Sequence, residues 1–206
     1  NGGTTDNAFM IEVDETYPSY DTPVDMPIFL AGFYLDVDND GLNDLVVVGE
    51  WMPVTIFRNN EGQLINETEK WGLAKNTGWW YGLQVFDMEN DGDLDLVVGN
   101  LGLNYKYKAS IDKPFEVFYN DFDENGTEDI VLGVHKEGRL LPLRGRECSS
   151  QQIPAIKAKY GTYREFAAAD LPEIYGVSML EKSEHYTATT FAHYWLENTG
   201  EGTFKW

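Results

Sequence analysis

Carboxylate side chains recur at fixed spacing in three nine-residue segments of this chain. Acidic or amide residues stand at positions 1, 3, 5 and 9 of each segment, and glycine stands at position 6. Side-chain oxygens at these positions, with a backbone carbonyl at position 7, can surround a hard dication, while glycine permits the sharp turn. The sequence therefore predicts three cation loops: Asp36, Asp38, Asp40, Leu42 and Asp44 in loop one; Asp87, Glu89, Asp91, Asp93 and Asp95 in loop two; and Asp121, Asp123, Asn125, Thr127 and Asp129 in loop three.

Calcium is the cation that this chemistry favours, with up to three ions bound. Carboxylates packed so closely repel one another, and a bound dication removes that repulsion. Mg²⁺ prefers to keep its waters in a strict octahedron, and softer metals disfavour all-oxygen ligands. Loop three has Asn125 in place of one carboxylate, so we expect it to bind most weakly. The alternative interpretation is three solvated acidic turns without an ion.

Each loop lies between two apolar stretches that are rich in β-branched and aromatic residues. The preceding stretches are 28–35, 79–86 and 115–119, and the following ones begin directly after position 9. An EF-hand is excluded because position 12 requires Glu, whereas Val47, Val98 and Leu132 stand there. The predicted unit is therefore strand, acidic loop, strand, repeated along the chain.

The spacing of the loops suits a four-stranded propeller blade. Fifty-one residues separate Asp36 from Asp87, which is the length of one blade, but only 34 separate Asp87 from Asp121. The second blade is therefore expected to be compact. The C-terminal stretch 187–204 is expected to form the outer part of a further blade.

The pattern Asp-x-Asp-x-Asp/Asn-Gly-x-x-Asp followed by Leu-Val-Val-Gly resembles the FG-GAP/VCBS repeat. That resemblance implies blades like those of integrin α-subunit propellers, with calcium in the acidic loop. The segments 78–81, 99–104 and 146–152 also resemble large exported bacterial VCBS-repeat proteins. We therefore expect a mainly β fold: a partial β-propeller of about three to four blades with calcium-binding loops and a short helical insert. Residues 1–206 are interpreted as a single propeller segment, a fragment of a longer propeller.

The interval at about 147–186 breaks the strand pattern and favours helices. Thr162 with Glu165 and Ser178 with Glu181 are candidate capping boxes, and Asp170 before Pro172 is typical of a helix start. This helical insert is expected to cover one face or edge of a sheet. The alternative is that it forms a docking surface.

Composition limits the possible partners. The chain has 35 acidic and 15 basic residues and a formal net charge of -20, which would repel a nucleic acid backbone. No apolar run approaches the length of a membrane span. Cys148 is the single cysteine, so an intramolecular disulfide and a Cys/His zinc cluster are both excluded.

The sequence favours a non-catalytic scaffold over an enzyme. His135, His185 and His193 belong to no catalytic motif. We expect an extracellular, cell-surface or periplasmic/outer-membrane-associated recognition or adhesion module with a protein or glycan ligand. Two sets of residues could have a second role. Trp51, Trp79, Trp80 and Tyr81 would either stack on sugar rings or pack between blades. A polysaccharide-binding or polysaccharide-degrading enzyme would draw on His135, Arg139, Arg144, Arg146, Lys106 and Lys108.

Overall fold

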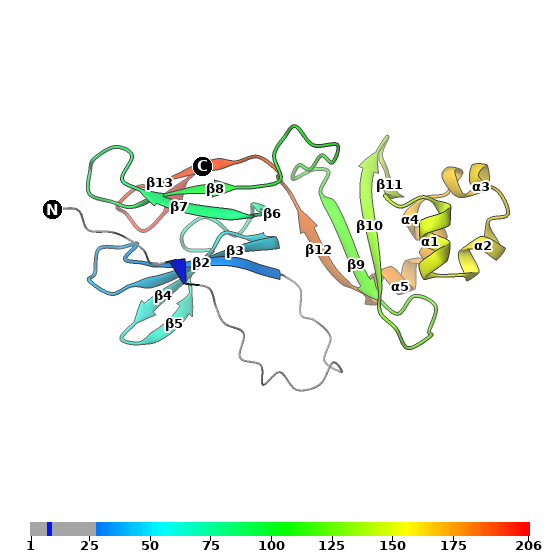
Figure 1. Cartoon of the computed structure of the whole chain (residues 1–206), viewed down its shortest axis with the longest axis horizontal. Helices are drawn as coiled ribbons and strands as arrows, with labels where there is room; N and C mark the ends of the chain where they lie inside the picture. The colour runs from blue at the N-terminus through cyan, green and yellow to red at the C-terminus, as the bar shows by residue number, and fades with distance from the viewer. Residues whose placement is uncertain (1–7, 10–27) are drawn as a thin grey trace. The chain divides into compact units, whose positions relative to one another are not determined.

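The computed structural model describes residues 8–9 and 28–206, which form two compact units. Unit 1 combines the described residues up to Lys106 with Thr190–Trp206, and unit 2 comprises Tyr107–Thr189. Both units are built on antiparallel sheets, which confirms the prediction of a mainly β fold (Figure 1). That the chain is one propeller segment stays a prediction.

The first sheet of unit 1 has the strand order β1-β2-β3-β4-β5, and β6 pairs with the far end of β3. β3 is buried over most of its length and β4 at its start, as expected for strands rich in Val, Ile and other apolar residues in a core. Loop one joins β2 to β3. The strands are β1 (Ala8–Phe9), β2 (Ile28–Leu35), β3 (Asp44–Pro53), β4 (Thr55–Asn60), β5 (Gln63–Asn66) and β6 (Thr77–Trp79).

A bulge at Trp51 allows β3 to change its pairing partner. Trp51 has a φ of 62°, a conformation that costs energy for a bulky side chain, and the register with β6 shifts between Glu50 and Met52. The ring of Trp51 is buried and meets Trp79 edge-on at a centroid distance of 5.1 Å. Packing in the core therefore holds the strained backbone in place.

The second sheet of unit 1 is assembled from two distant parts of the chain. Its order is β14-β13-β8-β7, and β13 pairs directly with β8. The prediction that the C-terminal stretch belongs to a further blade is therefore wrong, as is the prediction of a compact second blade, because β13 and β14 complete the sheet of β7 and β8. Unit 2 is inserted between β8 and β13 instead. The strands are β7 (Gly82–Phe86), β8 (Asp95–Gly99), β13 (Tyr194–Asn198) and β14 (Phe204–Lys205).

The core of unit 1 lies between its two sheets, which Figure 1 shows one above the other. Val46 and Ile56 from the first sheet share this core with Leu96 and Leu196 from the second, and all four side chains are fully buried. Trp80 is also completely buried and donates its indole N–H to the carbonyl of Met52 at 2.8 Å. Burial of these apolar side chains is the main stabilising contribution.

Unit 2 contains one four-stranded sheet, ordered β11-β10-β9-β12, together with five short helices. Loop three joins β9 to β10, and the helices lie between β11 and β12 in the chain. The strands are β9 (Phe115–Asn120), β10 (Asp129–Lys136), β11 (Arg139–Pro142) and β12 (Glu184–Ala188). The helices, called the helix cluster below, are α1 (Arg146–Gln152), α2 (Ala155–Lys159), α3 (Tyr163–Ala168), α4 (Leu171–Tyr175) and α5 (Val177–Lys182).

The helical insert lies where the sequence predicts it, with differences at its ends. Thr162 and Glu165 form a capping box at the start of α3, and Asp170 forms one with Glu173 at the start of α4. The predicted box at Ser178 is wrong: α5 begins at Val177, and its N-cap is Gly176 with a φ of 89°. The C-terminal end of the predicted insert is strand, because residues 184–188 pair with β9.

Candidate metal centres

The three acidic loops fold in the same way, down to single hydrogen bonds. In each loop the N–H groups of positions 5 and 6 donate to the two carboxylate oxygens of position 1, at 2.7–3.1 Å. The N–H of position 7 donates to the side chain of position 5, and the N–H of position 2 donates to position 9. The repeat seen in the sequence is therefore a repeat of local structure.

The backbone of each loop turns through two left-handed residues. Position 4 has a φ of 57° at Asn39, 59° at Asn90 and 57° at Glu124. Position 6 is glycine in every loop, with φ values of 87°, 98° and 85°. Glycine adopts this conformation at little cost, which explains why the pattern requires it.

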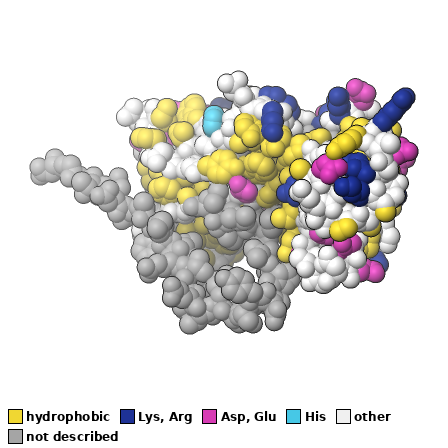
Figure 2. Space-filling view, turned by 45° about the vertical axis from the view of Figure 1, so that its right-hand side comes forward, with side chains coloured by type: hydrophobic (Ala, Val, Ile, Leu, Met, Phe, Trp, Pro, Cys, Tyr) yellow, Lys and Arg dark blue, Asp and Glu magenta, His cyan; other side chains and the backbone are white. Residues whose placement is uncertain are grey.

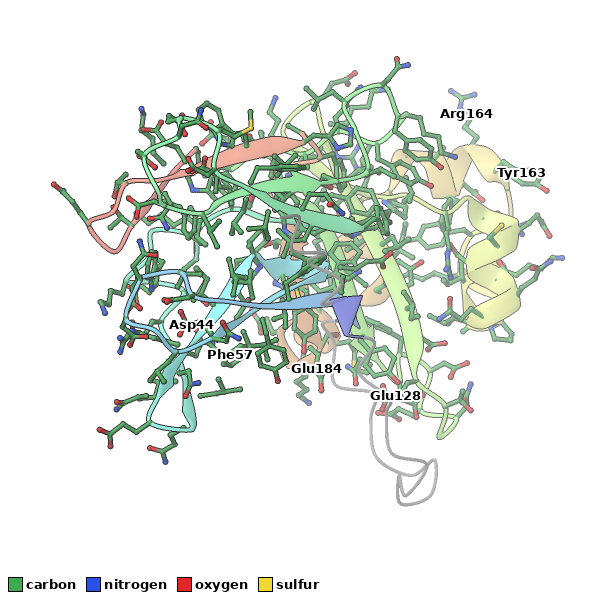
Figure 3. All side chains as sticks on the ribbon, turned by 60° about the vertical axis from the view of Figure 1, so that its left-hand side comes forward. Asp44, Phe57, Glu128, Tyr163, Arg164 and Glu184 are labelled. Carbon is green, nitrogen blue, oxygen red and sulfur yellow. The ribbon has the colours of Figure 1, made fainter. Side chains whose placement is uncertain are left out.

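The aspartate at position 9 anchors each loop to its sheet. Asp44, Asp95 and Asp129 are almost fully buried, and one oxygen of each accepts the N–H of position 2. The second oxygen of Asp44, a residue labelled in Figure 3, accepts the N–H of Asn59 on β4 at 2.7 Å. Burial raises the pKa of both Asp44 and Asp129, because the charged form loses hydration.

Loops one and three bring three carboxylates together, as a cation site requires. The candidate ligand atoms of Asp36, Asp38 and Asp40 lie within 4.8 Å of one another, and so do those of Asp121, Asp123 and Asp129. Asp44 lies outside the first group, although the sequence predicts it as a ligand. Among the described residues, Asp38 Oδ1 and Asp123 Oδ1 are buried without a hydrogen-bond donor. A buried carboxylate oxygen left unpaired is costly, so a bound cation fits both positions.

Loop two is open by comparison. Asp87, Glu89 and Asp91 are exposed, and no three carboxylates of this described loop meet the same distance limit. Asp93 accepts the side-chain N–H of Asn39 from loop one at 2.6 Å. Desolvation and the adjacent carboxylate of Asp95 hold the pKa of Glu89 above its ordinary value. The structure therefore does not assemble the five predicted ligands of this loop, and the longer Glu89 side chain is the clearest local difference.

Arg58 on β4 reaches into loop one. Its guanidinium donates to Asp38 through Nε and to Asp40 through a terminal nitrogen at 2.5 Å. These contacts raise the pKa of Arg58, with the hydrogen bond to Asp38 as the largest cause. Loop one thus contains an internal cation that partly neutralises its carboxylates, which the sequence pattern did not indicate.

The aromatic cluster proposed for sugar stacking is largely a packing feature. Trp51 and Trp80 are buried in unit 1, and Trp79 packs against Trp51 and against Phe191. Tyr81 is the exposed member of this set, and its hydroxyl donates to Glu50 at 2.9 Å. The interpretation as packing residues is therefore confirmed for Trp51 and Trp80.

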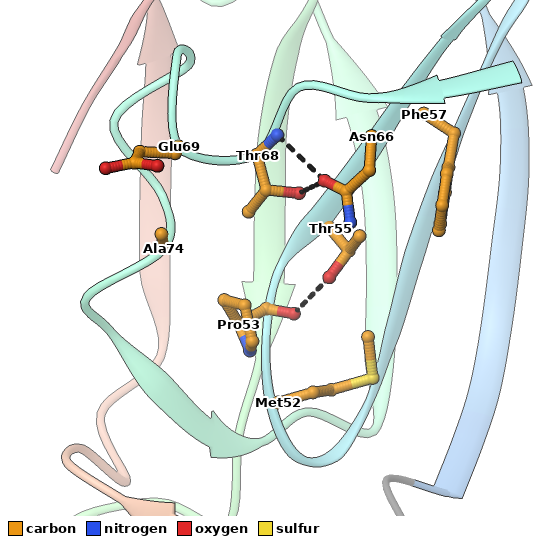
Figure 4. A pocket seen from close by; sticks show the side chains of 8 residues that line it. All are labelled: Met52, Pro53, Thr55, Phe57, Asn66, Thr68, Glu69 and Ala74. Atoms are coloured by element: carbon orange, nitrogen blue, oxygen red, sulfur yellow. Dashed lines mark hydrogen bonds between the residues drawn. The ribbon is translucent and has the colours of Figure 1, made fainter.

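Unit 1 also has a pocket of about 370 Å³ beside β4 and β5 (Figure 4). Three of its polar side chains are hydrogen-bonded locally: the Thr55 hydroxyl donates to the carbonyl of Pro53, and Asn66 Oδ1 accepts from the N–H and hydroxyl of Thr68. The remaining wall is mostly apolar. The lining residues are Met52, Pro53, Thr55, Phe57, Asn66, Thr68, Glu69 and Ala74.

The three arginines considered for an enzyme have structural partners in unit 2. Arg146 is buried and donates to the carbonyl of Tyr160 at 2.6 Å, and Arg144 donates to Gln152 Oε1 at 2.8 Å. Arg139 donates to the carbonyl of Ala168. On the face shown in Figure 2, basic and acidic side chains are interspersed over the part that comes forward at the right. The three arginines therefore hold the helix cluster rather than line a common mouth.

A carboxylate with two histidine partners was missed by sequence reasoning. Glu116 on β9 is buried, and its oxygens contact His135 Nε2 of β10 at 2.5 Å and His185 Nε2 of β12 at 2.7 Å. The ring of His185 stacks on Phe118. Strand pairing explains the cluster, because His135 lies two residues after Gly133 and His185 two residues before Thr187, the direct partners of Glu116. No local motif could indicate it.

Comparison with known families agrees with the loop geometry. Residues 36–98, which hold loops one and two, match the family model described as an FG-GAP-like repeat. Within a mainly β chain, this segment is therefore similar to an FG-GAP-like repeat. No curated protein and no solved structure matches the chain. Similarity to exported VCBS-repeat proteins stays a prediction.

Among the described residues, no helix is long and apolar enough to cross a bilayer.

Proposed function

We propose that this chain is a calcium-binding, non-catalytic recognition or adhesion scaffold that works outside the cytoplasm. It forms part of a larger FG-GAP-type propeller, in which calcium holds the loops between paired strands. The observation that carries the proposal is the shared loop geometry, with buried unpaired oxygens at position 3 of loops one and three. An FG-GAP-like repeat over residues 36–98 supports the same class.

Loops one and three are the principal ion sites in this proposal. Each gathers three carboxylates, and each lies at the base of a strand pair that an ion would join. Loop two binds more weakly, because its carboxylates have to move together first. This order differs from the one expected from charge alone, which places loop three last.

Titration calorimetry with CaCl2 on the full chain tests the proposal. We expect at least two binding events, one lost in Asp36→Asn/Asp38→Asn and another in Asp121→Asn/Asp123→Asn. Asp112→Asn removes an exposed carboxylate outside the loops and serves as the control. The free energy of unfolding should be larger in excess calcium than in EGTA. At a free calcium concentration 100 times the dissociation constant, one site contributes about 2.7 kcal/mol. Equal stability in both buffers, without heat of binding, would reject calcium.

A polysaccharide-active enzyme is the second candidate. The cluster of Glu116, His135 and His185 favours it, since a carboxylate that orients imidazoles is a common acid–base arrangement. A glycan array combined with a turnover assay separates the two functions. Binding without product supports the scaffold, whereas product formation that is lost in Glu116→Gln supports the enzyme.

A further inference from the structure

Loop three has a different neighbour from the other two loops. In loops one and two the second oxygen of the position-9 aspartate accepts a strand N–H, from Asn59 and Asn198 respectively. In loop three the side chain of Gln152, the last residue of α1, interacts with Asp129 and opposes the rise that burial causes in the pKa of that carboxyl. A helix therefore takes the place of a strand at this candidate site.

Gln152 is held in position by a second contact. Arg144 donates to Gln152 Oε1 at 2.8 Å and also approaches the carbonyl of Ile130 on β10. With its oxygen engaged by Arg144, the amide of Gln152 has its N–H groups left to donate to Asp129. The contacts thus run from Arg144 through Gln152 to a carboxylate of loop three.

Phe122, at position 2 of loop three, packs on the helix cluster. Phe122 donates its backbone N–H to Asp129, and its ring packs on the cluster core around Ile153, Ile156 and Ile174. The Phe122 ring meets Tyr175 edge-on at 5.4 Å. The equivalent residue of loop two, Met88, is 53% exposed.

The loop and the helices also share a cavity wall. A pocket of about 260 Å³ is bounded by Asp123 of loop three, by Phe122, and by residues of α2 and α4. Asp123 carries the buried unpaired oxygen described above. A change in the spacing of the loop carboxylates therefore acts directly on side chains that pack on the helices.

We propose that loop three and the helix cluster form one cation-dependent element, with Gln152 as a positioning residue for Asp129. This inference rests on the proposed function at loop three. Asp121, Asp123 and Asp129 would hold the ion, which would remove their mutual repulsion, and Asp129 would then stay beside Gln152 with Phe122 packed on the cluster. When the ion leaves, the carboxylates repel one another and the packing of α1 and α2 on the loop loosens.

Hydrogen exchange of the full chain measures this coupling. Amides of α1 and α2 should exchange about tenfold more slowly in 1 mM CaCl2 than in EGTA, since ordering by a ligand raises local protection. Asp121→Asn/Asp123→Asn should abolish that difference. Asp36→Asn/Asp38→Asn should leave it intact, because loop one lies in unit 1.

Gln152 is tested by substitution with methionine, which keeps the length of the side chain and removes the amide. Partners of metal ligands typically contribute 10–100-fold to metal affinity, so Gln152→Met should weaken the loop-three calcium site about tenfold by calorimetry. The matched control is Gln151→Met, the exposed neighbour on the same helix, which should bind as the native chain does. Both variants keep the loop carboxylates intact.

The outcomes separate the two proposals. If Asp121→Asn/Asp123→Asn removes a binding event but calcium leaves exchange of α1 and α2 unchanged, the coupling is wrong and the scaffold function stands. Unchanged calcium affinity in Gln152→Met also overturns the role of Gln152. If the native chain binds no calcium, both proposals fail together.

Discussion

Asn198 donates its backbone N–H to Oδ1 of Asp95 at 2.8 Å, although 103 residues separate them in the chain. Its side-chain amide donates to the carbonyl of Val37 in loop one at 2.9 Å and approaches the carbonyl of Leu94 in loop two. One buried asparagine at the end of β13 therefore joins both loops of unit 1. The two sheets are held together at this end by polar contacts as well as by the core.

Asn198→Ala should destabilise unit 1 by about 1–3 kcal/mol, because the buried carbonyl of Val37 loses its donor. Urea unfolding followed by tryptophan fluorescence measures the change. Asn60→Ala, at an exposed end of β4, is the control and should lie within about 0.5 kcal/mol of the native chain. A similar loss in both variants would contradict the proposed role of Asn198.

Unit 1 should fold without unit 2. Gly102 donates its N–H to the carbonyl of Phe191 at 2.8 Å, so the chain on either side of the insertion is already in contact. We expect residues 1–104, joined through a short Gly-Ser linker to residues 190–206, to unfold cooperatively with a near-UV signal from buried Trp80.

Leu196→Ala within the shortened chain tests whether the core between the two sheets has formed. Leu196 is fully buried between the sheets, and its truncation should cost about 2–5 kcal/mol if the native core has formed. A shortened chain without near-UV signal, or one insensitive to this substitution, would show that unit 1 depends on the insertion.

Arg58→Gln should increase the effect of calcium on stability. The substitution removes the guanidinium from Asp38 and Asp40, so the calcium-free loop loses its internal counter-charge. The melting temperature in EGTA should fall, and the rise produced by calcium should become larger than in the native chain. Differential scanning calorimetry measures both quantities, and Lys70→Gln on an exposed side chain is the control. An unchanged calcium response would show that Arg58 does not compete with the ion.

Glu116 should make the stability of unit 2 sensitive to acid. Burial raises the pKa of its carboxyl, but hydrogen bonds from His185 and His135 outweigh burial and leave that pKa below the ordinary value of 4.5. The folded state then binds fewer protons than the unfolded state. The contribution of Glu116 is therefore present above pH 4.5 and is lost as pH falls through the lowered folded pKa.

Glu116→Gln should flatten this acid dependence and lower stability at pH 6 by about 1–3 kcal/mol, because two charge-assisted hydrogen bonds are weakened. Chemical unfolding at a series of pH values measures both effects. Glu137→Gln, in the exposed turn between β10 and β11, should keep the native pH profile. Equal acid dependence in the native and Glu116→Gln chains would exclude Glu116 as the group responsible.

The acidic loops and the start of α3 and α4 could be predicted from sequence because their contacts are short-range. Hydrogen bonds within a loop span at most seven residues, as from Val37 to Asp44, and the capping boxes span three. Glycine at position 6 and an acid at position 1 are sufficient to define the turn locally. Residue type and spacing therefore determined the three loops, their flanking strands and much of the helical insert.

Only the tertiary structure decided which strands share a sheet and which carboxylates meet. The pairing of β13 with β8 spans an inserted unit, and periodicity within a strand carries no information about its distant partner. For the same reason, the sequence could not predict the contact of Arg58 with loop one or that of Gln152 with Asp129. Burial of Trp80, rather than exposure to a ligand, was also fixed by packing between sheets, since an aromatic side chain suits either setting.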